Sequence, residues 1–326
     1  MNISIAMATY NGAKYLQEQL DSFATQTLLP DELVVCDDGS TDQTLEIIEN
    51  FSRTVAFNVR VYRNKIRLGF VQNFGRAMSL CTGDVVFLSD QDDYWFFNKI
   101  ETVAAIFKER PNAWVVINDA EITDEKLKPT GLTIISQIHS AGLNDDEHNH
   151  GCCSSYRKNF SEVILPMPDY IVGHDIWLHF ISLSFECREL TIQPLQFYRR
   201  HSSNHSEHIT SNTSRISKLM LFSNLFSHRN LRQNPVDACN NRLLQLNSFR
   251  QRIKFKKDFL LKNFPFSDKL EKSLLHIEKL IFANENRKKI LLKNLPSRLA
   301  SAIYFYLTGG YKNFEGIKSF AKDVLR

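Results

Sequence analysis

The stretch that decides the fold is VVFLSDQDD at residues 85–93, where an apolar run ends in a polar and acidic cluster. The VVFL run is short and rich in β-branched and aromatic residues, which favours a buried strand. The DQDD that follows, Asp90–Asp93, adds three carboxyl groups and one amide directly after it. We therefore predict a strand that delivers a group of oxygen atoms to one edge of a sheet.

Three earlier segments repeat this form, an apolar strand pattern followed by a polar turn, at residues 3–8, 33–36 and 59–62. Apolar residues recur at helical spacing between the first two, and Ser40–Gln43 has the capping-box pattern of a helix start. Strands that alternate with helices predict an α/β fold with a mostly parallel central sheet flanked by helices. A further strand is predicted at residues 113–118, followed by loops and a hairpin over 119–149.

Polar clusters follow three of the predicted strands, at Thr9–Gly12, Asp37–Ser40 and Asp90–Asp93. In parallel sheets the ligand crevice lies beyond the carboxyl ends of the strands. Carboxylate oxygens suit Mg²⁺ or Mn²⁺, which share their coordination shell with substrate phosphates. The alternative is that each cluster is a solvated turn or helix start, where acidic residues are favoured. Two acidic clusters at one edge favour a crevice that binds a divalent ion.

Composition and charge limit the class of protein. The 326 residues are 43% hydrophobic and 23% charged, which indicates one large or two ordinary globular domains and excludes a disordered or collagen-like chain. The six cysteines form no CxxC pair, which argues against a zinc module or a disulfide framework. No run approaches the roughly 20 apolar residues of a membrane-spanning helix, and Met1 leads directly into a strand pattern, so we expect a cytoplasmic protein.

The charge is divided unequally along the chain. Residues 1–205 hold 17 basic and 27 acidic residues, whereas residues 206–326 hold 23 basic and 9 acidic residues. The second part also shows long helical patterns at 240–263 and 269–294. We therefore predict two parts, a catalytic domain at 1–205 and a basic, mostly helical region at 206–326.

The motifs, taken in order, resemble those of family 2 glycosyltransferases, which have the GT-A fold. The resemblance covers roughly residues 1–205 and rests on ATYNG at 8–12, DDGSTD at 37–42, the stretch 64–74 with LGF at 68–70, and SDQDDYW at 89–95. GHDIW at 173–177 and YRRHSSN at 198–204 resemble the rhamnosyltransferase-like branch in particular. The family implies a nucleotide-sugar donor and an inverting transfer to a glycan or lipid-linked glycan.

The resemblance also implies roles for individual residues. Those it places against the substrates are Thr9, Tyr10, Asn11, Asp37, Asp38, Asp90, Asp93, Gly151 and His174. The first five would surround the base and ribose, and Asp90 would touch the ribose or the sugar. Asp92 would bind the divalent ion that bridges the diphosphate, and His201 would approach the same ion or the diphosphate. For His201 the alternative is an ordinary surface histidine.

Asp175 corresponds to the acid that serves the family as catalytic base. An acceptor hydroxyl is a poor nucleophile until its proton is taken up, and a carboxylate opposite the leaving nucleotide diphosphate performs that step. Attack on one face with departure from the other inverts the anomeric carbon. The alternative for Asp175 is an acid favoured at a helix start by the helix dipole.

These expectations combine into a metal-dependent transferase that moves one sugar, rhamnose from dTDP-rhamnose, in the assembly of a surface polysaccharide such as O-antigen or capsule. The rivals are a UDP-hexose-dependent transferase of the same fold and a catalytically silent nucleotide-sugar-binding protein. The basic, apolar-rich stretches 250–262, 279–293 and 300–318 predict peripheral docking at an anionic membrane, at the inner face of the cell membrane. Their alternative is helix packing or a homodimer, and no nucleic-acid partner is expected.

Overall fold

The computed structural model describes residues 1–202, 204, 209–217, 220, 234–264, 267–314 and 316–325. The chain forms two compact units, Met1–Leu221 and Phe222–Arg326. The domain boundary predicted after residue 205 lies outside the described residues, as does Ser203 of the YRRHSSN motif.

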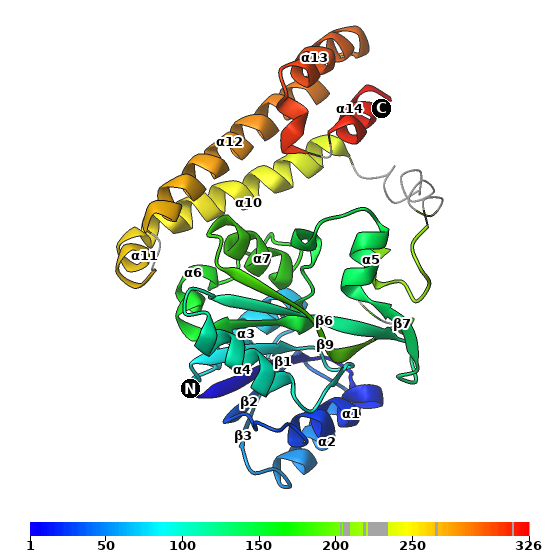
Figure 1. The fold of residues 1–326 in the computed structure, drawn as a ribbon, viewed down its shortest axis with the longest axis vertical. Coiled ribbons are helices and arrows are strands. Elements are labelled where there is room, and N and C mark those ends of the chain that lie inside the picture. Colours follow the sequence, from blue (N-terminus) through cyan, green and yellow to red (C-terminus); the bar gives the residue numbers. More distant parts are fainter. Residues whose placement is uncertain are drawn as a thin grey trace. The chain divides into compact units, whose positions relative to one another are not determined.

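One nine-stranded sheet organises the first unit (Figure 1). Its parallel part has the order β3, β2, β1, β4, with bounds Asn58–Arg63, Glu32–Asp37, Ile3–Thr9 and Val85–Ser89. β2 and β4 are buried along their whole length, because helices cover both faces, and β3 is partly exposed at the sheet edge. The four strands predicted for this part are confirmed.

The rest of the sheet is mixed. β8 runs antiparallel to both β4 and β6, and β9 runs parallel to β6 and antiparallel to β5. The bounds are Tyr94–Trp95 for β5, Val115–Thr123 for β6, Ser154–Arg157 for β8 and Arg188–Arg199 for β9. This arrangement brings the segment after β4 beside the end of β9, although the two are far apart in sequence.

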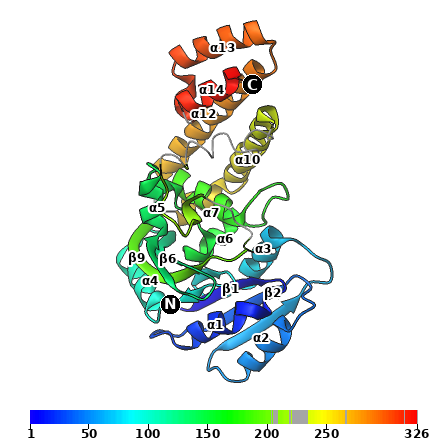
Figure 2. The ribbon, with the colours of Figure 1, turned by 90° about the vertical axis from the view of Figure 1, so that its right-hand side faces the viewer.

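Helices pack on both faces of the parallel strands. Right-handed crossovers from β1 to β3 place α1 and α2 on one face, and the return to β4 places α3 on the other, as Figure 2 shows. The helices of the first unit are α1 (Ala13–Ala24), α2 (Thr44–Ser52), α3 (Phe70–Leu80), α4 (Lys99–Glu109), α5 (Ile134–Ser140), α6 (Ser161–Ile164) and α7 (His174–Ser184). Leu16 and Phe23 of α1 are fully buried against the core residues Ile5 and Val35.

Two local predictions need correction. The capping box expected at Ser40–Gln43 is absent, since Gln43 makes no side-chain cap and the Thr44 amide instead donates to Asp42 Oδ1 at 3.1 Å. The segment 119–149 contains the expected hairpin, between β6 and β7 (Pro129–Thr133), but it also contains α5. Thr133 and Ser136 form a reciprocal capping box at the start of α5, which explains a helix in a polar, irregular stretch.

The second unit is helical in its described residues. Its helices are α10 (Pro235–Phe255), α11 (Lys257–Asn263), α12 (Ser267–Leu291), α13 (Leu295–Leu307) and α14 (Ile317–Leu325). α10 packs along α12, with Phe249 and Ile277 buried. Arg287 of α12 donates two 2.8 Å hydrogen bonds to Asp323 of α14. None of the helices in the described residues is both long and apolar enough to cross a membrane.

The imidazole of His148 makes the stability of the first unit depend on pH. His148 is fully buried, with Nε2 3.0 Å from the Asn118 carbonyl oxygen, and burial lowers its pKa to about 3. The unfolded chain therefore binds a proton below about pH 6.5 that the folded chain does not bind until about pH 3. Stability is lost as pH falls through this window, and from pH 7 to pH 5 we expect His148 to remove about 2 kcal/mol.

Urea unfolding followed by tryptophan fluorescence checks this prediction, since all three tryptophans lie in the first unit. His148→Gln keeps a donor for Asn118 but no group that titrates in this range, so its stability should fall less between pH 7 and pH 5 than that of the wild type. His276→Gln, at an exposed histidine between 267 and 291, is the control and should keep the wild-type pH dependence. Equal pH dependence in all three proteins would contradict the role of His148.

Candidate active site

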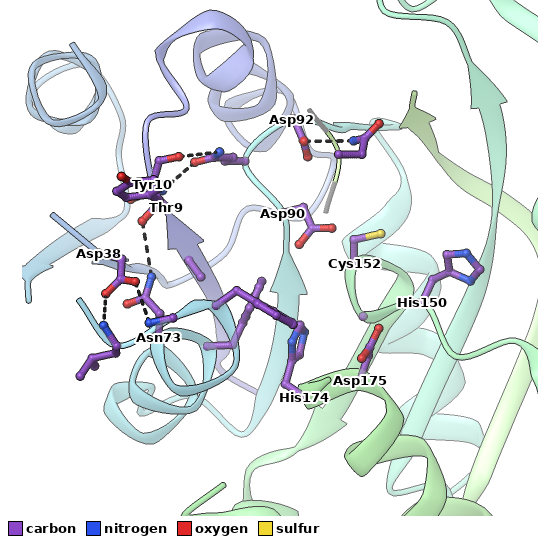
Figure 3. A pocket seen from close by; sticks show the side chains of 18 of the residues that line it. Thr9, Tyr10, Asp38, Asn73, Asp90, Asp92, His150, Cys152, His174 and Asp175 are labelled. Carbon is purple, nitrogen blue, oxygen red and sulfur yellow. Dashed lines mark hydrogen bonds between the residues drawn. The ribbon is translucent and has the colours of Figure 1, made fainter. Parts of the chain in front are cut away.

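A cavity of about 640 Å³ opens at the carboxyl ends of β1 and β4, where the ligand crevice was predicted. Figure 3 shows Thr9 and Asp38 toward one side of it, Asp175 and Cys152 toward the other, and Asp90 between them. Of the predicted site residues, the structure places these on the cavity wall: Thr9, Tyr10, Asp38, Asp90, Asp92, Gly151, His174 and Asp175. Residues from four separate motifs thus meet at one hollow.

Asp38 shapes the end of the cavity beside β1. Its buried carboxylate accepts hydrogen bonds from the Leu68 amide at 2.7 Å, the Gly69 amide at 2.9 Å and Asn64 Nδ2 at 2.8 Å. Gly69 has φ +78°, in the left-handed region that favours glycine, so the loop turns back toward the carboxylate. Asp38 therefore holds the LGF segment against the cavity.

Asp37 is turned away from the cavity. It is fully buried, accepts from Thr9 Oγ1 at 3.1 Å, and accepts from the amides of Gly39 at 3.1 Å and Ser40 at 2.9 Å. It is not among the lining residues. Its observed contacts fix the turn after β2, a supporting position rather than one against a ligand.

Tyr10 and Asn11 sit at the mouth of the same end. The Arg67 guanidinium lies 3.9 Å from the centre of the Tyr10 ring, and Gln91 Oε1 accepts from the Tyr10 amide at 3.0 Å. Asn11 has φ +47° and its side-chain oxygen accepts from the Thr41 amide at 2.9 Å. Tyr10 therefore presents an aromatic face at the cavity, whereas Asn11 joins two loops and does not line it.

The acidic cluster after β4 is crowded. Asp93 is buried, accepting from the Arg199 amide at 3.1 Å and from Gln196 Nε2 at 3.0 Å, and burial raises its pKa to about 7. Part of Asp90 faces the cavity, yet its deep position and the charges of Asp92 and Asp93 raise its pKa well above the usual range. Such crowding is costly without a cation, so the cluster favours binding one.

Asp92 and His201 lie together, although 109 positions separate them in the chain. His201 Nε2 is 2.9 Å from Asp92 Oδ2, and Asn204 Nδ2 lies 3.4 Å from the same oxygen. A carboxylate beside an imidazole and an amide is a donor set that suits Mn²⁺ or Mg²⁺. These residues of the DQDD and YRRHSSN motifs therefore fit a divalent ion.

A second group of possible ligand atoms suits such an ion less well. Atoms of Asp90, Asp93 and Cys152 lie within 4.8 Å of one another. A hydrogen bond with Cys153 and burial hold the pKa of the Cys152 thiol well above its usual range, so its sulfur stays protonated. A protonated thiol is a poor ligand for the hard cations Mg²⁺ and Mn²⁺.

Lys99 supports the acidic cluster from below and has no counterpart in the sequence predictions. The buried ammonium donates to the Cys152 carbonyl oxygen at 3.0 Å and to Gln196 Oε1, and burial lowers its pKa to about 8. Gln196 in turn donates to Asp93, which links Lys99 to the DQDD segment. Lys99 is the first residue of an amphipathic helix, and nothing in the sequence pattern distinguishes it there from a solvated lysine.

Asn73 is a second site residue for which the sequence predicts no role. It lines the cavity from α3, and its Nδ2 donates to the Cys36 carbonyl oxygen at 2.7 Å. Its Oδ1 accepts from Asn64 Nδ2 at 2.8 Å, which connects it to the Asp38 carboxylate. Only its position in the stretch 64–74, three residues after LGF, hints at this role.

Two glycines bring Asp175 to the cavity. Asp175 lies in the first turn of α7, and its Oδ1 accepts from the Ile176 amide at 2.8 Å. A Cβ at Gly173 would collide with Asp175 Oδ1, and a Cβ at Gly151 would lie 2.6 Å from His174 Nε2. A larger residue at position 173 would displace the Asp175 carboxylate, and one at position 151 would displace the His174 ring.

His174 forms an apolar wall with α3. Its ring stacks on Phe74 with centroids 3.9 Å apart and planes at 20°, and Phe70 approaches it edge-on at 6.3 Å. Burial lowers the pKa of His174, and neither ring nitrogen has a hydrogen-bond partner among the described residues. This wall lies between the Asp38 end of the cavity and Asp175.

Comparisons with known proteins identify relatives of this chain. Residues 4–165 match the family described as Glycosyl transferase family 2. The dTDP-rhamnosyl transferase RfbG of Shigella flexneri is 35% identical over 29% of this chain and 34% of its own. The UDP-Glc:alpha-D-GlcNAc-diphosphoundecaprenol beta-1,3-glucosyltransferase WfgD of Escherichia coli is 25% identical over 43% of this chain and 56% of its own.

The fold is also that of a solved structure. TarS 1–349 of S. aureus, in complex with UDP, superposes with a TM-score of 0.56 at 16% identity, covering 100% of this chain and 90% of that one. The predicted GT-A fold with a helical C-terminal part is confirmed by this likeness.

Proposed function

We propose that this chain, a glycosyltransferase whose residues 4–165 match the family 2 model, transfers a single sugar from a nucleotide-sugar donor with inversion at the anomeric carbon. The observation that carries the proposal is that Asp175 and Asp92 line one cavity, with His201 in contact with Asp92 behind its wall. A base and a diphosphate-binding group on separate walls suit displacement from opposite faces of the sugar.

The residues divide the reaction among them. Tyr10 and Asp38 bind the nucleoside end of the donor. Asp92 and His201 would hold a divalent ion, which would supply positive charge to stabilise the leaving diphosphate. Asp175 accepts the proton of the acceptor hydroxyl as its oxygen attacks the anomeric carbon, and the bond to the diphosphate oxygen breaks.

We propose rhamnose from dTDP-rhamnose as the donor sugar. The wall made by Phe70, Phe74 and the stacked His174 suits the methyl group that a 6-deoxysugar carries in place of a hydroxymethyl group. The likeness to a dTDP-rhamnosyl transferase supports the same choice. The alternative is a UDP-hexose, which is favoured by the likeness to WfgD.

The acceptor proposed is a glycan or a lipid-linked glycan of a cell-surface polysaccharide. The name of WfgD specifies an acceptor on diphosphoundecaprenol, and this supports a lipid-linked acceptor here. Since no Gln-x-x-Arg-Trp motif is present in the sequence, addition of a single sugar is favoured over processive synthesis.

Competition binding tests the choice of donor. With Mn²⁺ present, we expect dTDP-rhamnose to displace a fluorescent dTDP probe at a concentration about 10-fold or more below that of UDP-glucose, a ratio within reach of hydrophobic-pocket discrimination. Phe70→Gln should weaken dTDP-rhamnose about 10-fold and leave dTDP unchanged, because only the sugar contacts the wall. Phe97→Gln, at an exposed surface position, should change neither. Tighter binding of UDP-glucose would overturn the rhamnose assignment.

A further inference from the structure

α13 exposes an unusual number of large apolar side chains for a helix of 13 residues. Tyr304 is 71% exposed and Leu307 is 77% exposed, and Ala302 is the helix's one buried residue. The exposed apolar residues of α13 are Leu295, Leu299, Ile303, Tyr304, Tyr306 and Leu307. A contiguous apolar surface of this kind marks a binding surface for a protein or a membrane.

The exposed side chains form a continuous face. At about 100° of rotation per residue, they cover about half of the helix circumference, beginning with Leu295 and ending with Tyr304. The opposite half carries Arg298, Ser301, Ala302 and Phe305, which are buried or partly buried against the rest of the second unit. α13 is therefore amphipathic, but its large aliphatic residues face solvent instead of the rest of the second unit.

The surroundings of this face are strongly basic. Residues 286–314 contain six basic residues and no acidic one. Lys279, Lys289 and Lys293 of the α12 segment line a hollow of about 920 Å³ together with Tyr304 of α13. The residues that line this hollow include no carboxylate, and Lys293 Nζ donates to Ser301 Oγ at 2.8 Å beside it.

We propose that α13 docks the protein on an anionic lipid bilayer. The aliphatic face enters the headgroup level, and the lysine-lined hollow receives lipid phosphates. Tyr304 and Tyr306 suit this position, because tyrosine is favoured where an apolar and an aqueous phase meet. The positive charge around this face favours an anionic lipid surface as its partner. A second copy of this chain is disfavoured, since two such faces would bring like charges together.

The docking surface proposed here is smaller than the one predicted from the sequence. The predicted stretch 250–262 and the first part of 279–293 belong to the hairpin of α10, α11 and α12, where Ile253, Leu260 and Ile281 are buried. The docking surface is defined here by α13, by Lys289 near the end of α12 and by Lys293 just after it. Vesicle binding is measured without turnover, so the proposal does not depend on the donor or on the reaction proposed above.

Co-sedimentation of the full chain with vesicles tests the proposal. We expect binding to vesicles of phosphatidylglycerol and phosphatidylcholine to be at least about 10-fold stronger than to phosphatidylcholine alone, and to weaken between about 0.05 M and 0.5 M NaCl. Leu299→Gln with Ile303→Gln should lower binding at both salt concentrations by about 10-fold or more, because two apolar groups no longer enter the lipid. Lys289→Gln with Lys293→Gln should lower binding chiefly at low salt.

Matched controls are Leu275→Gln, at an exposed leucine of α12 outside the docking surface, and Lys108→Gln, at an exposed lysine of the first unit. Both should bind as the wild type does. Equal binding to the two kinds of vesicle, or unchanged binding by the Leu299→Gln and Ile303→Gln variant, would overturn the proposal. So would a dimer, measured by light scattering, that this variant converts to monomer, since a second copy would then cover the face. Donor binding by the same variants should stay normal, which separates this test from that of the proposed function.

Discussion

Replacing Asp175 by Asn is expected to lower the rate of sugar transfer by about 10²–10⁴-fold while the donor still binds, the range typical for loss of a general base. The amide has the size of the carboxylate and its oxygen can still accept from the Ile176 amide, so the start of α7 should keep its geometry. It has no lone pair basic enough to take the acceptor proton. Single-turnover transfer and calorimetric donor binding measure the two effects separately.

Asp237→Asn is the matched control for this variant. Asp237 is an exposed acid in the first turn of α10 and does not line the cavity, so the change removes the same kind of helix-dipole interaction without altering the cavity wall. It should leave both transfer and donor binding unchanged. If donor affinity of Asp175→Asn falls in parallel with its rate, Asp175 positions the donor or supports the fold and is not the base.

Replacing Asp92 by Ala is expected to abolish metal-dependent transfer, with a loss of at least about 10³-fold, because stabilisation of the leaving group by a metal ion is worth several kcal/mol. His201 and Asn204 would remain but without the carboxylate between them. Thermal stability without ligands should stay equal or rise slightly, since the charge of Asp92 is among those that raise the pKa of Asp90 and Asp93. Transfer assays across a Mn²⁺ titration and a thermal melt measure both effects.

Asp21→Ala, at an exposed carboxylate of α1, controls for the loss of an ordinary acid and should keep full activity. The metal role of Asp92 would be wrong if the variant kept turning over. It would also be wrong if the wild type were equally active in excess chelator.

The parallel half of the sheet was predictable because each of its strands is a short β-branched run that ends in a polar turn. α5 was not, since the capping pair of Thr133 and Ser136 precedes only a short apolar segment inside a polar stretch. The start of α2 was misassigned for a related reason. Ser40 and Asp42 both fit a cap by residue type, and the helix begins after Gln43 because Asp42 Oδ1 accepts from the Thr44 amide.

Within the site, the motifs predicted that Thr9, Asp38, Asp90 and Asp175 lie near one another, because the chemistry and order of the motifs are distinctive. All four residues line one cavity. Asp37, Asn11 and Asp93 belong to the same motifs but hold loops together, and residue type alone does not separate a ligand-facing acid from a buried acceptor of amide hydrogen bonds. The supporting residues Lys99 and Gln196 lie outside every motif, and Asn73 lies in the stretch 64–74 without a predicted role. Their roles depend on strand pairings that join distant segments, such as β5 with β9.

The most direct test of sugar transfer by this protein is release of nucleotide diphosphate from dTDP-rhamnose by the wild type, with a glycolipid extract as the source of acceptor. Release should require both Mn²⁺ and the extract, and it should fall by about 10²-fold or more in Asp175→Asn. Release from none of a panel of dTDP- and UDP-sugars, with or without Mn²⁺, would contradict it and leave a nucleotide-sugar-binding protein without transfer activity.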